Sequence, residues 1–123
     1  MRIVLLVDDS SVARRVLARA LSAAGYGVQE VESMRAASRA DVTAISCAIV
    51  DLELGDGDGT VVASALQAKR PSLPIAFFTT GTTPSLVEAA RGRGPVFSKP
   101  DVAPVVAWVK RAIGSSRQPP PTK

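Results

Sequence analysis

The chain has 123 residues, 46% of them hydrophobic, which is enough for one domain with a buried core of its own. It contains no histidine and a single cysteine, which excludes histidine-based catalytic triads, histidine metal sites, cysteine zinc clusters and intramolecular disulfides. Lysine and arginine outnumber aspartate and glutamate by 15 to 11, but these basic residues are scattered and aromatic residues are few, so we do not expect this domain to bind nucleic acid. We expect Cys47 to be a small buried residue in a reducing cytoplasm.

The N-terminal part of the chain predicts a strand followed by a helix. The apolar run RIVLLV stops at Asp8, which is typical of a strand buried on both faces, and it is too short for a signal peptide. Ser10 or Ser11 can cap the helix, and Gly25 ends it. The apolar residues of this helix recur at helical spacing and are Ala13, Val16, Leu17, Ala20, Leu21 and Ala24. The arginines outside that stripe are interpreted as a solvated face and are Arg14, Arg15 and Arg19.

The rest of the chain continues the alternation of strands and helices. Further strands are predicted near Val28–Val31, in CAIVD up to Asp51, in PIAFFTTG up to Thr79 and Thr80, and in PVFSKP. Further helices are predicted over Met34–Ala40, Thr60–Lys69 and Ser85–Arg91, with a last one through Val105–Ile113 that has Pro104 in its first turn. This alternation predicts an α/β fold with a parallel sheet covered by helices on both faces. No segment approaches membrane-spanning length, and the polar, proline-rich residues 115–123 are predicted to be a mobile tail or the start of a linker.

Several polar residues follow or end the buried strands, at the edge of an open parallel sheet where ligands bind. They are Asp8, Asp9, Asp51, Thr79 and Lys99. Carboxylates brought together repel one another unless a divalent cation neutralises them, and Mg²⁺ suits such a site because it accepts carboxylates together with phosphate oxygens. Lys99 supplies a positive charge, and Thr79 supplies a hydroxyl donor for a phosphoryl oxygen. The predicted reaction is attack by the Asp51 carboxylate on phosphorus.

The ordered motifs VDD, AIVD, FFTTG and SKP resemble those of the receiver domain of two-component response regulators, over residues 1–114. The resemblance implies a flavodoxin-like, doubly wound fold, with a five-stranded parallel sheet of order 2-1-3-4-5 and five helices in three layers. The resemblance implies that Asp51 is the phosphoacceptor, and that Asp8, Asp9, Asp51 and the backbone carbonyl of Glu53 are the magnesium ligands. It also implies that Thr79 is the switch hydroxyl and that Lys99 is the phosphate-binding lysine. The peptide bond between this lysine and the following proline is often cis in the family.

The same resemblance implies a function. The domain would accept a phosphoryl group on Asp51 from a phosphohistidine of a histidine kinase or a histidine phosphotransfer protein, with Mg²⁺ as the cofactor. It would then signal in the cytoplasm through protein–protein contacts with a downstream target. It would catalyse only its own phosphorylation and dephosphorylation, and so would not be an enzyme for other substrates. The lack of histidine fits this scheme, because the histidine would belong to the partner.

The chain departs from the receiver pattern in four places. Gly55 stands where receivers usually have a proline, which gives a looser loop after the acceptor. Thr80 stands where many receivers have alanine, and its larger side chain is expected to slow access to the phosphate. Val96 replaces the switch aromatic three residues before the lysine, and the neighbouring Phe97 is expected to point to the opposite face. The segment 81–94 is short for the fourth helix and its loops. We therefore expect the phosphorylation chemistry together with an altered signalling transition.

Three alternatives compete with this interpretation. The segment DGDGT, residues 56–60, resembles the signature of haloacid-dehalogenase-type phosphatases with Asp56 as the nucleophile, but that family places it directly after an apolar strand, whereas LELG precedes it here. A calcium loop from the same residues would lack its closing glutamate. Glu53, Asp56 and Asp58 are therefore interpreted as solvated loop acids. A pseudo-receiver adaptor, which acts without phosphorylation, would lack an acid, the acceptor or the lysine, and this chain has all of them.

Overall fold

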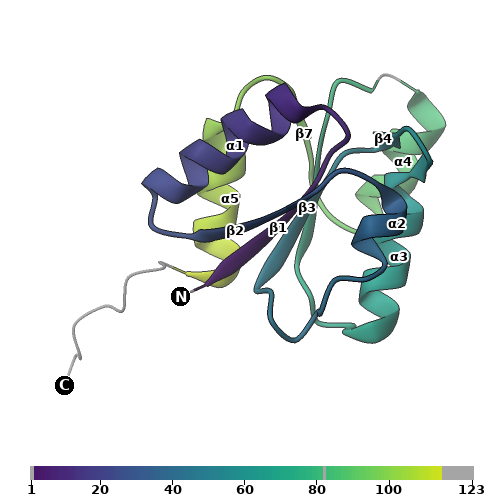
Figure 1. Ribbon diagram of the computed structural model, residues 1–123. Coiled ribbons are helices and arrows are strands. Elements are labelled where there is room, and N and C mark those ends of the chain that lie inside the picture. The colour runs from purple at the N-terminus through teal and green to yellow at the C-terminus, as the bar shows by residue number, and fades with distance from the viewer. Residues whose placement is uncertain (1, 82, 115–123) are drawn as a thin grey trace.

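The computed structural model describes residues 2–81 and 83–114, and its centre is a parallel sheet (Figure 1). The strands of this sheet are β1 (Ile3–Val7), β2 (Gly27–Val31), β3 (Cys47–Val50), β6 (Ile75–Thr79) and β7 (Val96–Ser98). Their order across the sheet is β2-β1-β3-β6-β7, and every neighbouring pair is parallel. Counted within this sheet, the order is the predicted 2-1-3-4-5. Because the order reverses between β1 and β3, ligands are expected where these two strands end.

Helices cover both faces of the sheet, which gives the predicted three layers (Figure 1). The helices α1 (Ser11–Ala23) and α5 (Ala103–Ile113) pack on one face, and α2 (Met34–Ala37), α3 (Gly59–Lys69) and α4 (Pro84–Arg91) pack on the other. Successive residues of β1 alternate between the two core clusters: Val4 and Leu6 pack with α1 and α5, and Leu5 and Val7 pack with the other helices. All four are at most 1% exposed, so β1 is buried on both faces as predicted.

The boundaries of α1 confirm the prediction, whereas the environments of two of its side chains do not. The Ser10 Oγ accepts a hydrogen bond from the Ala13 amide at 3.3 Å, and Gly25, with φ of 96°, follows the helix. Val16, which was predicted to face the core, is 49% exposed because it lies on the side of α1 that borders an opening beside Asp51. The Arg14 side chain, which was predicted to be solvated, is only 13% exposed because it folds back onto the end of β1 and onto β2.

The helix α2 is shorter than predicted and depends on a cap from a distant residue. The prediction extended it to Ala40, whereas it spans only Met34–Ala37. The Asp56 carboxylate accepts hydrogen bonds from the Met34 and Arg35 amides at 2.8 Å and 3.0 Å. These amides belong to the first turn, where a helix leaves its donors without intrahelical partners. Asp56 is exposed, in agreement with its interpretation as a solvated acid, but it also caps α2, which was not predicted.

The acidic loop after β3 forms a short hairpin that was not predicted. Its antiparallel strands, β4 (Glu53–Leu54) and β5 (Gly57–Asp58), lead directly into α3. The Asp58 Oδ1 accepts hydrogen bonds from the Thr60 amide at 2.7 Å and the Thr60 hydroxyl at 2.6 Å. Asp58 is thus the N-cap of α3 and not a solvated loop acid.

The last third of the chain largely confirms the predicted elements. The helix α4 begins at Pro84, one residue before the predicted start. Val96 packs with the cluster under α3 and α4, whereas Phe97 packs with the cluster under α1 and α5, so the two side chains point to opposite faces. The peptide bond between Lys99 and Pro100 is cis. Across residues 2–81 and 83–114, no helix has both the length and the apolar character needed to cross a membrane. The predicted tail, residues 115–123, lies outside the described residues.

Candidate functional site

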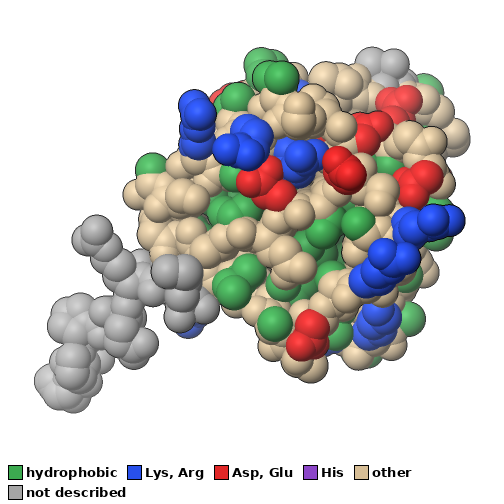
Figure 2. Space-filling model, in the orientation of Figure 1, with side chains coloured by type: hydrophobic (Ala, Val, Ile, Leu, Met, Phe, Trp, Pro, Cys, Tyr) green, Lys and Arg blue, Asp and Glu red, His purple; other side chains and the backbone are tan. Residues whose placement is uncertain are grey.

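The carboxyl ends of the central strands bring three carboxylates together. Asp8 follows β1 and is 6% exposed, Asp51 follows β3 and is 7% exposed, and Asp9 is exposed beside them. Each offers an oxygen, and these oxygens all lie within 4.8 Å of one another. Figure 2 shows several acidic side chains on the surface at this end of the molecule, near β4, with basic side chains beside some of them. The cluster predicted from the sequence is therefore present in the fold.

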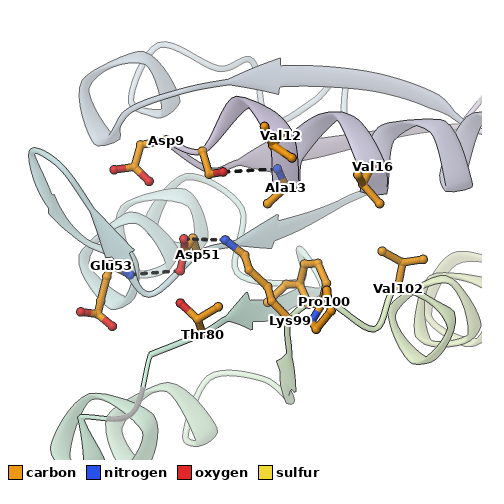
Figure 3. Close-up of a pocket in the computed structure, with 12 residues that line it drawn as sticks. Asp9, Val12, Ala13, Val16, Asp51, Glu53, Thr80, Lys99, Pro100 and Val102 are labelled. Atoms are coloured by element: carbon orange, nitrogen blue, oxygen red, sulfur yellow. Dashed lines mark hydrogen bonds and ion pairs between the residues drawn. The ribbon is translucent and has the colours of Figure 1, made fainter.

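Lys99 reaches into the cluster from the end of β7 (Figure 3). Its Nζ lies 2.8 Å from Asp8 Oδ2 and 2.9 Å from Asp51 Oδ2, and its side chain is 9% exposed. One ammonium group offsets only one of the three negative charges. An all-oxygen donor set with unbalanced negative charge fits a hard divalent cation such as Mg²⁺.

The electrostatics of the pair formed by Asp8 and Lys99 follow from this arrangement. Burial raises the pKa of the Asp8 carboxyl, because this effect outweighs the hydrogen bonds that it accepts from Lys99 and the Ser10 amide. Burial acts to lower the pKa of Lys99, but its hydrogen bonds to Asp8 and Asp51 outweigh that effect, and the pKa of Lys99 is raised. Lys99 is thus held in its cationic form, and the buried acids favour the entry of further positive charge.

The backbone around Asp51 is closely packed. Its Oδ1 accepts a hydrogen bond from the Glu53 amide at 3.2 Å, which joins the carboxylate to the β4–β5 hairpin. A Cβ added to Gly59 would lie 2.2 Å from the Asp51 carbonyl oxygen, a distance that no side chain allows. Glycine at the start of α3 therefore lets this helix approach the end of β3. The proposed ligation by the Glu53 carbonyl remains a prediction.

Thr79, at the end of β6, is 3% exposed. Its Oγ1 accepts a hydrogen bond from the Gly81 amide at 2.8 Å, so its own proton remains able to donate to another acceptor. A Cβ on Gly81 would lie 2.5 Å from Glu53 Oε1 and 2.9 Å from Thr79 Oγ1, which places the Glu53 side chain over this turn. Thr79 is thus at the predicted end of the sheet, with its hydroxyl oriented by the chain that follows.

An opening of about 520 Å³ leads to the cluster. It has a polar end near the acids and an apolar wall made by α1, β6 and the chain after β7 (Figure 3). The polar end is lined by Asp9, Ser10, Asp51, Glu53, Thr80 and Lys99, and the apolar wall by Val12, Ala13, Val16, Phe78, Pro100 and Val102. Val12, at 75% exposed, and Val16 were missed as site residues; their spacing of four on one helix, one turn after the acids, is the signal that could have indicated them.

Comparison with known proteins identifies the class of domain. The response regulator receiver domain family matches residues 4–98. The chain therefore belongs to the receiver domains of response regulators, the phosphorylated signalling domains of two-component systems, and its acidic cluster is consistent with phosphorylation and with the divalent metal site typical of this family. Such domains interact with histidine kinases or phosphotransfer proteins.

Individual relatives and solved structures agree with this assignment. The photosynthetic apparatus regulatory protein RegA of Rhodobacter capsulatus is 35% identical over 124 residues, which cover 98% of this chain and 67% of RegA. The response regulator protein TrrA of Thermotoga maritima, solved in complex with Mg²⁺-BeF, has a TM-score of 0.81 at 21% identity, covering 91% of this chain and 99% of that one. The N-terminal domain of a response regulator/sensory box/GGDEF protein of Carboxydothermus hydrogenoformans has a TM-score of 0.76 at 28% identity, covering 91% and 94%.

Proposed function

We propose that this chain is the phosphoacceptor of a two-component phosphorelay, phosphorylated on Asp51 from a phosphohistidine of a histidine kinase or a histidine phosphotransfer protein. The observation that carries the proposal is the position of Asp51: a buried carboxylate at a strand end, 2.9 Å from Lys99 and clustered with two further acids. Residues 1–114 form the receiver domain, which acts in the cytoplasm through contacts with a downstream protein. It catalyses only its own phosphorylation and dephosphorylation.

The chemistry is a transfer of one phosphoryl group. An Asp51 oxygen attacks phosphorus as the phosphorus–nitrogen bond of the donor breaks, and the bonding electron pair stays on the imidazole, which takes up a proton. Asp8, Asp9, Asp51 and the Glu53 carbonyl would hold Mg²⁺. The ion supplies positive charge that neutralises the acids and the phosphoryl oxygens. Lys99 and the Thr79 hydroxyl hold the new oxygens by hydrogen bonds.

Phosphorylation of the chain tests the proposal directly. With a small-molecule phosphodonor and Mg²⁺, the intact mass should rise by one phosphoryl group, and Asp51→Asn should abolish the rise. Asp56→Asn and Asp58→Asn are matched controls that remove a nearby carboxylate, and both should leave labelling nearly unchanged. Labelling that survives in Asp51→Asn would refute the acceptor assignment. A wild-type chain that no donor labels would instead support an adaptor that works without phosphorylation.

The apolar wall of the opening supports a protein as the natural donor. Val12 is 75% exposed and Val16 is 49% exposed, beside the acids that a donor must reach. A protein surface that covers these side chains would gain from their burial, whereas a small phosphodonor would not. Val12→Asp should therefore slow transfer from a phosphohistidine protein and leave labelling by the small donor nearly unchanged. Val61→Asp on α3 is the matched control, since Val61 is 53% exposed and away from this opening.

A further inference from the structure

Arg14 contacts both the acidic end of β1 and the edge strand β2. Its Nη1 donates a hydrogen bond to the backbone carbonyl of Asp8 at 2.6 Å, and its Nε donates to Glu30 Oε1 at 2.9 Å. The side chain of Arg14 is 13% exposed and that of Glu30 is 28% exposed. The guanidinium group is therefore held between two strands, whereas the neighbouring Arg15 is exposed.

The carbonyl that Arg14 contacts belongs to the peptide between Asp8 and Asp9. Because a peptide is planar, a bond to its oxygen orients the whole unit that joins the two acids. The other polar groups of Asp8 are held separately: its amide donates to the Val31 carbonyl at 3.1 Å, its Oδ1 accepts from the Ser10 amide at 2.9 Å, and its Oδ2 lies 2.8 Å from Lys99 Nζ. Arg14 thus completes the set of contacts that define the backbone and the carboxylate of Asp8.

We propose that Arg14 is a positioning residue for the metal site. By holding the peptide between Asp8 and Asp9, it keeps both carboxylates directed at Asp51, and its bond to Glu30 anchors this arrangement to β2. The inference rests on the proposed function, since it assumes that the acids bind Mg²⁺. Arginine suits the role because its planar fork donates in two directions at once, whereas the lysine ammonium is a single charge on a flexible stem.

Calorimetric titration of the full chain with Mg²⁺ tests this role. Loss of a group that orients metal ligands without contacting the metal weakens metal binding by about 10–100-fold, and we expect a loss in this range for Arg14→Gln. Arg15→Gln removes the same charge from the next position of the same helix and should bind Mg²⁺ like the wild type. Arg14→Lys keeps the charge but cannot make both contacts, so its affinity should stay closer to that of Arg14→Gln than to the wild type.

A second variant and a second readout keep the test independent of folding. Glu30→Gln retains an oxygen for the Arg14 Nε but removes the charge, so it should fold and weaken Mg²⁺ binding less than Arg14→Gln does. Without metal, the Ser10 amide, which donates to Asp8 Oδ1, should exchange its hydrogen faster in both variants than in Arg15→Gln. If Arg14→Gln does not fold, the comparison of Glu30→Gln with Glu32→Gln decides, because the latter removes the same charge from an exposed position.

The outcomes that overturn the inference are distinct from those that overturn the function. A wild type that binds Mg²⁺ and an Arg14→Gln variant that binds it equally well would overturn this inference alone. An equal loss in Arg14→Gln and Arg15→Gln would show that the effect does not depend on the contacts of Arg14, and would overturn it too. A wild type that binds no Mg²⁺ would overturn the proposed metal site, and this inference with it.

Discussion

The two sides of the site are built differently. On the side of β1 and β3, buried acids are held by Lys99 at 2.8 Å and 2.9 Å, and the loops around them are closely packed. On the side of β6 and β7, Thr80 is exposed, and Thr83, the N-cap residue of α4, makes no side-chain capping hydrogen bond. Val96 stands where receivers have an aromatic residue. The comparison indicates that this receiver keeps the buried acids and the lysine, while the segment that we expect to respond to phosphorylation diverges.

Among the changes on the side of β1 and β3, removal of Lys99 should have the largest effect on stability. Lys99→Met leaves Asp8 and Asp51 buried without their cation, and loss of one partner of a buried ion pair costs about 3 kcal/mol of unfolding free energy. We expect Mg²⁺ to restore part of this loss, because a cation that binds only the folded arrangement of the acids stabilises the folded state. Urea denaturation with and without Mg²⁺ measures both effects. Lys110→Met, at an exposed position of α5, is the control, and an equal loss there would contradict the prediction.

Substitution of Gly59 should disturb the packing on the side of β1 and β3 less than the loss of Lys99 does. In Gly59→Ala the new Cβ would lie 2.2 Å from the Asp51 carbonyl, so α3 or β3 must shift, at a cost of about 1–3 kcal/mol. Phosphorylation should slow as well, because the shift moves Asp51. Gly92→Ala is the matched control, since its Cβ would make an ordinary contact at 3.5 Å. Thermal denaturation and labelling rates check both expectations, and equal behaviour of the two variants would argue against the close packing at β3.

The side of β6 and β7 should carry the conformational response to phosphorylation. Val96 is short and has a restricted χ1, so it cannot turn inward as an aromatic side chain does. We expect a beryllium fluoride phosphate mimic to change hydrogen exchange mainly within residues 80–94, where glycines permit backbone shifts, and little within Val105–Ile113. A response confined to the residues that touch the mimic would favour an adaptor whose partners bind the unphosphorylated surface.

The smallest expected effect lies at the opposite end of β3 from Asp51. Burial raises the pKa of the Cys47 thiol from 9.0 to about 12. Because the unfolded thiol loses its proton first as the pH rises, this thiol destabilises the folded state above about pH 9, by about 1.4 kcal/mol one pH unit higher. Denaturation of the wild type and of Cys47→Ala across this pH range should show the extra loss only in the wild type. If the unfolding free energy depends on pH in the same way in both proteins, the thiol is more accessible than its burial indicates.

Much of the fold was predictable because continuous apolar runs end in polar residues. The runs that stop at Asp8 and Asp51 gave two central strands, and parallel topology then placed their acids at one edge with Lys99. The features that were missed or wrongly predicted depend on contacts between distant segments of the chain. Asp56 caps a helix 22 residues earlier in the chain, and nothing near Asp56 indicates that partner. Helical periodicity likewise placed Val16 on an apolar stripe without showing that this flank of α1 borders an opening.

The long separation between Asp51 and Lys99, 48 residues, has a consequence for synthesis. The ribosome makes the chain from its N-terminus, so β1 and β3 are complete well before the lysine that neutralises their acids. Until Lys99 emerges, burying Asp8 and Asp51 together would leave their charges without that partner. We therefore expect the acidic edge of the sheet to reach its final packing late, after β7 has been made and added beside β6. A nascent chain that stops before Lys99 should keep this edge open to solvent.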